Sequence, residues 1–278
     1  ALRDRKSVWT TLDAAQQRIV TSAIRQMEES GVGLEESQRA KFNALKLEAS
    51  ELSTKFSNNV LDSTKAFKLT ITDAQEMEGL PESARALAAQ QAVSEGHEKA
   101  DAASGPWVLT LDMPCYLPCM QHLKSRARRE QLYRAFVSRA SSGEVDNAPI
   151  IKRILQIKKE ISSILGYECY AEQSLAAKMA PSVASVKELT EMLLTKAYPA
   201  AQRELDELKS FSKKHGFSGD LALWDLPFWG ERLREAQYEF EEEELKPYFS
   251  MPKVLKGLFS LAERLFGVSI EQADDGAQ

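Results

Sequence analysis

The sequence predicts a mostly α-helical protein, a bundle of long antiparallel helices with at most one short strand or hairpin. Glycine and proline are scarce, at 13 and 10 of 278 residues, which favours long helices over a turn-rich fold. Apolar residues recur every three or four positions over most of the chain, and this is the spacing of a single helix face. The hydrophobic fraction of 43% is ordinary for a globular protein with a packed core.

Composition also excludes several classes of protein. The net charge of −5 gives no electrostatic case for binding nucleic acid, which requires a basic surface. We expect no membrane span, because no run approaches about 18 apolar residues. The charged residues 1–13 lack the apolar core of a signal peptide, and three cysteines do not suit a disulfide framework. We therefore expect a protein that is not secreted and that works in a reducing compartment.

Two helices are predicted in the first 67 residues. Residues 12–30 carry one apolar face and end at Gly31, a residue suited to a helix carboxyl end. Residues 35–67 form a longer helix, on the order of 48 Å at 1.5 Å per residue. Its apolar stripe consists of Phe42, Leu45, Ala49, Leu52 and Phe56. We expect the helix of residues 12–30 to cover this stripe, and the polar segment 58–62 to face solvent.

The middle of the chain combines helices with one strand. Residues 72–96 hold a short capped turn and a helix for which Pro81 is a suitable first residue. Residues 107–112 are the best strand candidate, because they are short, β-branched and aromatic. Residues 125–140 form a basic amphipathic helix with Leu132, Tyr133 and Phe136 on its apolar side. The arginines of this helix are expected to lie on a solvated face.

The remaining chain is again helical. Asp146 caps a helix that carries isoleucines at 150, 154, 157, 161 and 164 and ends at Gly166. A short helix falls within residues 167–179. A long helix then begins at Ser182 or Ser185 and ends at Gly216, with a kink expected at its internal Pro199. Further helices are predicted over residues 225–240, 243–249 and 252–266.

Few residues offer catalytic or metal-binding chemistry. His97 and His215 are most simply surface histidines. Cys115, Cys119 and His122 share one helix face and are residue types that bind zinc. Three ligands so close on one helix converge poorly on a tetrahedral ion, however, and buried cysteines are common. The acidic run 241–244 is best explained as a solvated helix start. We therefore predict no catalytic residue and no metal ligand in this chain, and no substrate-binding residue can be assigned.

Several blocks of sequence resemble one known family when they are taken in order. The blocks are SNNVLDSTKAF, WVLTLDMPCYLPCM, YRAFVSRASSG and, from Trp224 to Gly267, WDLPFWGERLREAQYEFEEEELKPYFSMPKVLKGLFSLAERLFG. Each block alone is weak, and their shared order makes the match specific. The chain resembles the thimet oligopeptidase family, in particular the oligopeptidase A enzymes of bacteria and their plant and algal relatives.

The resemblance implies a fold of two helical lobes that face each other across a deep channel with zinc on its floor. In that family an HExxH motif supplies two zinc ligands and a glutamate that acts as general base on a zinc-activated water. This sequence contains no HExxH, so no catalytic residue carries over. The resemblance implies that residues 1–278 form the helical lobe of a larger metallopeptidase, which could divide into 1–140 and 141–278.

We therefore expect a fragment of a soluble zinc metalloendopeptidase that hydrolyses short unstructured peptides. This chain would contribute the channel wall that limits substrate size, and the remaining catalytic part of the same protein would hold the zinc. The chain alone would bind no zinc and would be inactive. Nucleic acid and membrane are not expected partners, and the location would be the cytoplasm, or the chloroplast or mitochondrion after removal of a transit peptide. The alternative is a non-catalytic helical scaffold or interaction module.

Overall fold

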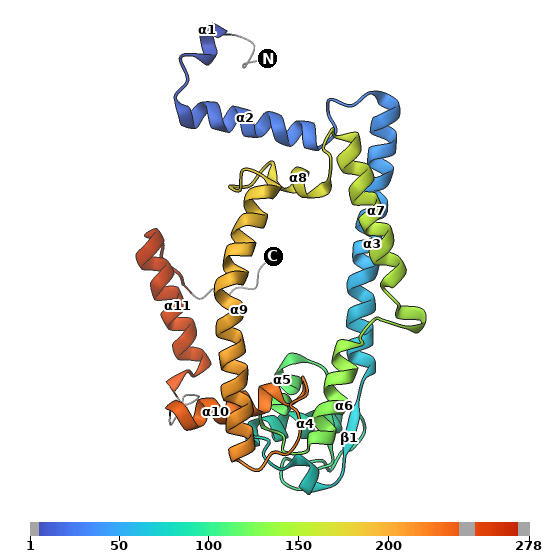
Figure 1. Cartoon of the computed structure of the whole chain (residues 1–278), viewed down its shortest axis with the longest axis vertical. Helices are drawn as coiled ribbons and strands as arrows, with labels where there is room; N and C mark the ends of the chain where they lie inside the picture. The colour runs from blue at the N-terminus through green and yellow to red at the C-terminus, as the bar shows by residue number, and fades with distance from the viewer. Residues whose placement is uncertain (1–5, 239–247, 272–278) are drawn as a thin grey trace.

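The computed structural model describes residues 6–238 and 248–271, which form an elongated frame of helices (Figure 1). One long side is α3 (Glu36–Ala66) with α7 (Ala148–Ile164), and the other is α9 (Val183–Lys214). At one end lie α1 (Lys6–Trp9), α2 (Ala14–Glu29) and α8 (Tyr170–Leu175). The other end, called the base below, holds α4 (Glu82–Ser94), α5 (Met113–His122), α6 (Arg126–Val137), α10 (Leu226–Tyr238), the 3-10 turn η2 (Ala74–Met77) and the strands β1 (Leu69–Ile71) and β2 (Trp107–Leu109). The mostly α-helical fold class is confirmed.

The apolar stripe of α3 packs against α7, which runs antiparallel to it (Figure 1). Phe42 and Leu45 of α3 form a buried cluster with Ile157 and Ile161 of α7. Leu52 packs at the margin of this cluster and is only half-buried. The guanidinium of Arg153 donates to Glu48 with both distances at 2.6 Å and joins the two helices beside the cluster. The sequence therefore identified the packing face of α3 correctly.

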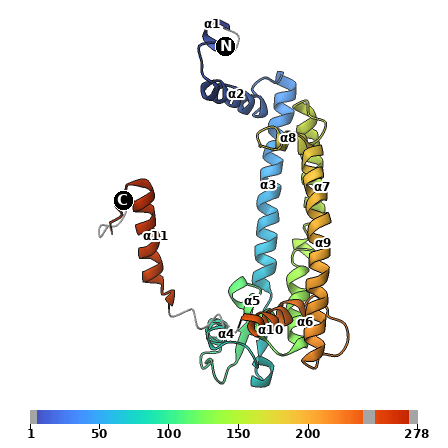
Figure 2. The same ribbon diagram turned by 60° about the vertical axis from the view of Figure 1, so that its left-hand side comes forward.

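The partner predicted for that face was wrong. Helix α2 lies across the amino-terminal end of α3 (Figure 2) instead of alongside it, and none of the side chains on α2 is buried. The reason is the turn between them, in which the amides of Gly31 and Val32 bond back to Glu28 and Met27. This turn ends α2 as predicted, but it directs the two helices at a large angle to each other (Figure 1).

One residue of the polar segment 58–62 is also buried, contrary to the expectation of a solvent-facing surface. Asn59 is 8% exposed, and its Nδ2 donates to Oδ1 of Asn147 at 2.9 Å. Nδ2 of Asn147 in turn donates to the Phe56 carbonyl at 3.1 Å. This amide pair ties the lower half of α3 to the start of α7, whereas Asn58 and Asp62 face solvent as expected. Asn147 itself is the cap residue of α7, one position after the predicted Asp146.

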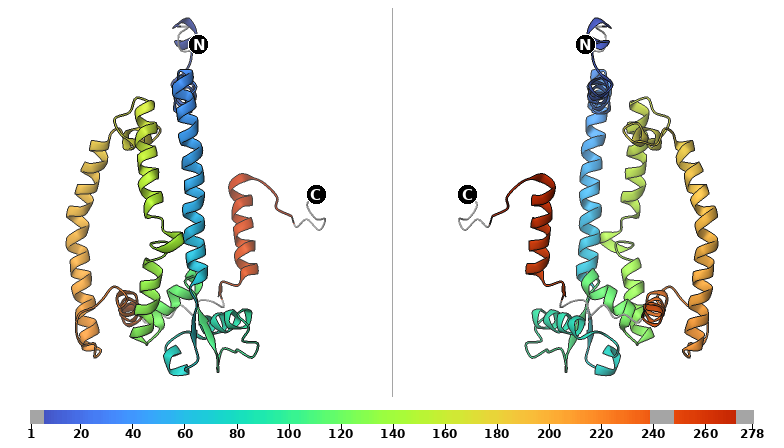
Figure 3. Two further views of the ribbon diagram at one scale, coloured as in Figure 1. Left: turned by 90° about the vertical axis from the view of Figure 1, so that its right-hand side faces the viewer. Right: turned by 90° about the vertical axis from the view of Figure 1, so that its left-hand side faces the viewer.

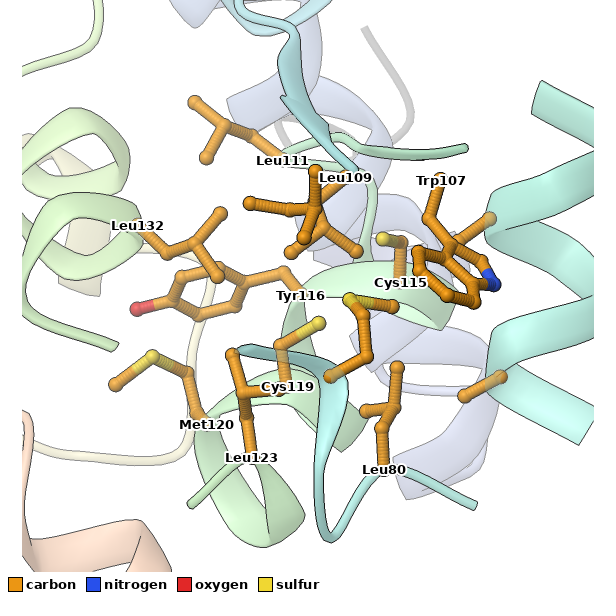
Figure 4. Close-up of a cluster of buried hydrophobic side chains, with 14 of the residues drawn as sticks. Leu80, Trp107, Leu109, Leu111, Cys115, Tyr116, Cys119, Met120, Leu123 and Leu132 are labelled. Carbon is orange, nitrogen blue, oxygen red and sulfur yellow. The ribbon is translucent and has the colours of Figure 1, made fainter. Parts of the chain in front are cut away.

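The main hydrophobic core lies in the base (Figure 4). Strands β1 and β2 pair antiparallel, with Leu69 opposite Leu109 and Ile71 opposite Trp107. Trp107 is fully buried, so the predicted strand is confirmed, although it ends at Leu109 because the chain then turns into α5. Helix α5 contributes Cys115, Tyr116, Cys119 and Met120 to the core, and α6 contributes Leu132. The apolar side predicted for α6 is therefore the side that packs.

Helix α9 crosses from one end of the frame to the other (Figure 3). It begins after Ser182, whose hydroxyl accepts from the Ser185 amide, and it is followed by Gly216 as predicted. The helix continues through Pro199 and curves smoothly instead of kinking sharply (Figure 3). Loss of the single amide donor at the proline is therefore accommodated within a continuous helix.

Helix α11 (Met251–Phe266) agrees closely with the helix predicted for residues 252–266. The helix expected at 243–249 and the acidic run 241–244 fall on or beside residues 239–247, outside the described part of the chain. Within the described part, no helix combines the length and the hydrophobicity required to cross a bilayer.

Substituting Leu45 by alanine should lower the free energy of unfolding by about 2–5 kcal/mol, because the side chain is buried between α3 and α7. The matched control is Leu47→Ala on the same helix, where the leucine is 63% exposed and the expected loss is below about 0.5 kcal/mol. Urea unfolding followed by circular dichroism would measure both variants. Equal losses would show that the α3–α7 interface does not hold the chain together.

Candidate functional site

The most strongly linked polar cluster in the described residues joins α6 to the amino-terminal end of α10. Arg126 donates from Nε and Nη2 to both carboxylate oxygens of Asp225, at 2.8–3.1 Å. Arg129, one turn further along α6, donates from Nη2 to Asp225 Oδ1 at 3.1 Å. The amide of Ala222 also donates to Asp225, at 3.0 Å. We call Arg126, Arg129 and Asp225 the arginine–aspartate junction.

The junction is buried from solvent on the Asp225 side. Asp225 is completely inaccessible and the Arg129 side chain is 3% exposed, while Arg126 reaches the surface. Burial alone would raise the pKa of Asp225, but the hydrogen bonds from Arg126, Ala222 and Arg129 outweigh it and lower the pKa below its usual value. Asp225 is therefore held as a carboxylate that satisfies two cations.

Aromatic rings complete the environment of both guanidinium groups. Arg126 lies over Phe217 and Trp224, in each case 5.6 Å from the ring centroid. Arg129 stacks over Phe228 at 4.1 Å and also donates from Nη1 to the Leu123 carbonyl at 2.6 Å. Its Nε and Nη1 donate in addition to the Trp224 and Lys124 carbonyls, so most of the donors of Arg129 have fixed partners. The cluster thus positions α10 but leaves no free acid or base for catalysis.

The structure corrects the expectation that the arginines of residues 125–140 form a solvated face. Arg134 is largely exposed, but Arg129 is among the most buried charged residues described. A signal for this was present, because Arg129 lies three, four and seven positions before Leu132, Tyr133 and Phe136. That spacing places it on the apolar side of the helix, where a charge requires a partner. The partner, Asp225, is 96 residues away and had no local signal.

His122, at the end of α5, takes part in a second polar contact with α10. Nη2 of Arg232 lies 2.9 Å from Nδ1 of His122, and the same guanidinium binds Glu235 at 2.7 and 3.0 Å. Arginine can only donate, so Nδ1 of His122 is the acceptor in this contact. Arg232 thus bridges His122 and Glu235, and α10 is held against the end of α5.

Cys115 and Cys119 lie one turn apart on α5, buried in the core (Figure 4). The hydrogen bond from the Cys119 thiol, together with the Thr110 amide, lowers the pKa of Cys115 to about 7 despite burial. The Cys119 thiol donates to its neighbour and is buried, and both effects raise its pKa. The two thiols thus satisfy each other inside an apolar cluster.

Cys115, Cys119 and His122 have the spacing of metal ligands in the sequence, but their side chains lie in two separate environments. The thiols pack in the core, while His122 contacts Arg232. Among the residues that the structure describes, no three His, Cys, Asp or Glu side chains are grouped to hold a metal ion. That this chain supplies no metal ligand stays a prediction, as does the absence of a catalytic residue.

The other two histidines lie where the sequence placed them. His97 is exposed in the loop after α4. His215 is exposed at the end of α9, with Nδ1 2.9 Å from the Phe211 carbonyl. That contact is the helix-terminus interaction expected of a histidine at this position.

Two long helices expose apolar rows that no described residue covers. Along the middle of α9 the exposed apolar side chains fall on two sides of the helix, with Leu189, Met192 and Leu193 on one side and Leu194 and Tyr198 on the other. Helix α11 exposes Val254, Leu255, Leu258, Phe259, Leu261, Leu265 and Phe266. On α11 these residues fall on one side and the lysines, Ser260 and Arg264 on the other. Exposed apolar side chains gathered in this way are typical of a protein–protein or interdomain contact.

Comparison with known proteins gives a consistent result along the chain. Residues 119–277 match Peptidase family M3, and residues 1–39 match the neurolysin/thimet oligopeptidase N-terminal domain. The organellar oligopeptidase A (chloroplastic/mitochondrial) of Arabidopsis thaliana is 52% identical over 268 residues, covering 96% of this chain and 34% of the relative. A probable cytosolic oligopeptidase A of the same plant is 51% identical, covering 96% and 38%. Oligopeptidase A of Escherichia coli is 35% identical over 272 residues, covering 96% and 39%. The chain thus spans between a third and two fifths of the length of these curated relatives.

Replacing Asp225 by asparagine should lower the free energy of unfolding by about 3–5 kcal/mol at neutral pH, because it leaves the buried Arg129 without a counter-charge. Asp206→Asn is the matched control, since its ion pair with Lys209 is exposed and its loss should cost less than about 1 kcal/mol. Urea unfolding would compare the two variants with the parent chain.

The same pair predicts a dependence on pH. The folded-state pKa of Asp225 is lowered, so its stabilisation is complete above the unfolded value of about 3.9 and disappears as the pH falls through the folded value. The difference between the parent chain and Asp225→Asn should therefore shrink in strong acid. A difference that is independent of pH would contradict the ionised junction.

Proposed function

Because the chain belongs to peptidase family M3, we propose that it is part of a zinc-dependent oligopeptidase that hydrolyses short peptides. The observation that carries the proposal is 52% identity to an oligopeptidase A over 96% of the chain. The matched relatives are about two and a half to three times as long as this chain, so the activity, its zinc and its peptide substrates are proposed for the whole protein. The names of the relatives favour the cytosol or a plant organelle as its location.

In this proposal the zinc ligands lie in the remaining part of the protein. The sequence of this chain contains no HExxH, and its described residues offer no group that fits the ion. The thiols of Cys115 and Cys119 are engaged with each other in the core, and His122 faces a guanidinium. This chain would then contribute shape and support, and no atom that takes part in bond cleavage.

We propose further that residues 1–278 act as one lobe and not as two domains divided near residue 140. Contacts across that position support this reading. Helix α7 packs on α3, the amide pair joins Asn59 to Asn147, and the arginine–aspartate junction joins α6 to α10. A division at residue 140 would break all three contacts and expose the buried residues Ile157 and Asp225.

The exposed rows of α9 and α11 would be where the rest of the protein packs. Helix α11 is amphipathic, and α9 is anchored at its two ends by α8 and α10 while its middle has no cover among the described residues. Burying one leucine from water contributes about 1.5–3 kcal/mol, so two such rows can stabilise a large interface. The lobe would thus be held at a fixed position relative to the zinc site.

A rigid helical lobe explains selection for short peptides by size. The α3–α7 pair is fixed by apolar packing and by ion pairs, and α9 is continuous over 32 residues. A folded domain of 100 residues has a radius of gyration of about 13 Å. An extended strand is only about 5 Å across in its pairing direction. Rigid walls would admit the strand and exclude the folded domain without reading the peptide sequence.

The full-length enzyme should cut a target peptide when it is free and should spare the same peptide displayed in a short loop of a stable folded protein. The expected result is a large loss of cleavage rate for the displayed peptide. The bond that is cut in the free peptide should stay intact in the folded carrier. Mass spectrometry of both substrates would measure it. A denatured sample of the carrier protein is the control, and it should be cut again. Comparable rates for free and displayed peptide would exclude selection by size.

The present chain alone should neither hydrolyse a quenched fluorescent peptide nor retain zinc after dialysis. The full-length protein should retain about one zinc per chain and should turn the peptide over, since three or four ligands are required for tight binding. Metal analysis and fluorescence on the two proteins would compare them. A zinc-loaded full-length protein with no turnover would favour the alternative of a non-catalytic scaffold.

A further inference from the structure

Helix α9 is held in the frame at its two ends. Its amino-terminal end packs against α8 and its carboxyl-terminal end against α10, while its middle has no cover among the described residues. Helices α3 and α7 form the long side on the opposite side of the frame (Figure 1). Within the described part of the chain, the contacts at the ends of α9 therefore set the separation of the two long sides.

The chain passes from α9 to α10 through residues 217–225, and Arg126 of α6 contacts both ends of this connection. Its guanidinium lies 5.6 Å from the ring centroid of Phe217 at one end. At the other end it donates to both carboxylate oxygens of Asp225, at 2.8–3.1 Å. Trp229 of α10 packs edge-on against the same Phe217 ring, with the centroids 5.8 Å apart. Arg126 thus links the base to the aromatic contact between α10 and the end of α9.

Arg126 is the outer member of the arginine–aspartate junction. Its side chain is 45% exposed, whereas Arg129 is buried and binds Asp225 from inside the base. Without Arg126, the buried carboxylate would still accept from Arg129 and from the Ala222 amide. Substitution of Arg126 therefore removes a restraint on the connection between α9 and α10 and leaves the buried ion pair in place.

A small change at this connection is amplified along α9. The helix has 32 residues, so it is about 48 Å long at 1.5 Å per residue. A tilt of about 4° around its amino-terminal end displaces its middle by about 2 Å. The exposed apolar side chains of α9 are where we propose that the rest of the protein packs, so that part would move with α9. A loosened connection would thus allow a wider gap between that part and the α3–α7 side.

We propose that Arg126 is a specificity-determining residue, which limits the width of the peptides that the enzyme accepts by restraining the position of α9. The inference rests on the proposed function, because it concerns the size limit of the same peptidase. Arg126 is a positioning residue that acts through α10 and α9, and its role requires no contact with a reacting atom. A wide substrate enters only when α9 has moved outward, so its apparent affinity follows the population of that state.

The kinetic test gives the full-length enzyme two substrates of the same sequence, a linear peptide and a hairpin closed by a terminal disulfide. Neighbouring strands lie about 4.8 Å apart, so the hairpin is about twice as wide as the linear peptide. Arg126→Gln should lower KM for the hairpin several-fold without changing kcat, because the open state is more populated. Both constants for the linear peptide should stay near those of the parent enzyme. A purely structural defect would instead lower kcat for both substrates.

Arg128→Gln is the matched control. Arg128 lies on the same helix, and its side chain, 29% exposed, binds both carboxylate oxygens of Glu76 at 2.8–3.1 Å. This contact stays within the base and does not involve α10. The control should leave the ratio of kcat/KM for hairpin and linear peptide unchanged. An unchanged ratio in Arg126→Gln, or the same shift in both variants, would overturn the proposal.

A second measurement on this chain is independent of activity. Spin labels on Glu51→Cys of α3 and Lys196→Cys of α9, both exposed positions, would report the distance between the two sides by double electron–electron resonance. The exposed Cys169 would be replaced by serine, and the other two cysteines are buried. Arg126→Gln should broaden the distance distribution, and Arg128→Gln should not.

The two measurements separate this proposal from the proposed function. An unchanged distance distribution in Arg126→Gln would overturn the role of Arg126 even if the enzyme is active. A full-length protein that does not cut the linear peptide would contradict the proposed function, and the distance measurement would still decide whether Arg126 restrains α9.

Discussion

The pairing of one buried carboxylate with two arginines is the interaction on which the arrangement of the base depends. Asp225 lies directly before α10, and Arg126 and Arg129 belong to α6, so three groups join segments almost a hundred residues apart. Isolated charges are not tolerated in an apolar interior, so each of these residues requires the others. Because α9 packs against α10, the junction also fixes the lower end of α9. The width of the frame at the base therefore depends on a contact made outside the hydrophobic core.

Helices could be predicted from the sequence because their signals are local. Periodicity, caps and glycines located α3, α7, α9 and α11 to within a few residues. Partners could not be predicted in the same way, since a stripe shows which face is buried but not what covers it. The α3 stripe was assigned to the helix nearest in sequence, whereas α7, about a hundred residues later, covers it. The family resemblance was visible for a different reason, because it rests on the order of several separate blocks.

The residues that were misassigned share one property. Arg129 on α6 and Asn59 on α3 are polar, and both continue an apolar stripe in register with it. Base rates for polar residues favour solvent, and those rates gave the wrong environment in both cases. Position on the stripe is the stronger evidence, and it implies a polar partner on another element. Here the partners are Asp225 and Asn147, which the sequence could not identify because they are distant along the chain.

Most of the base is inserted in the sequence between α3 and α7, and this has a consequence for the kinetics of folding. Most of the base, from Leu69 to Val137, is a continuous segment with its own hydrophobic core. Its two ends lie together, since the amide of Ala140 donates to the Ser63 hydroxyl at 3.1 Å. Contacts between α3 and α7 span 88 to 119 residues, from Asn59–Asn147 to Lys41–Glu160, a separation that is slow to close in an unstructured chain. Once the inserted segment has folded, the two helices start side by side, and the effective loop is only a few residues long. The antiparallel pair can then form by zipping outward from Asn59 and Asn147, so that a high sequence separation coexists with a short conformational search.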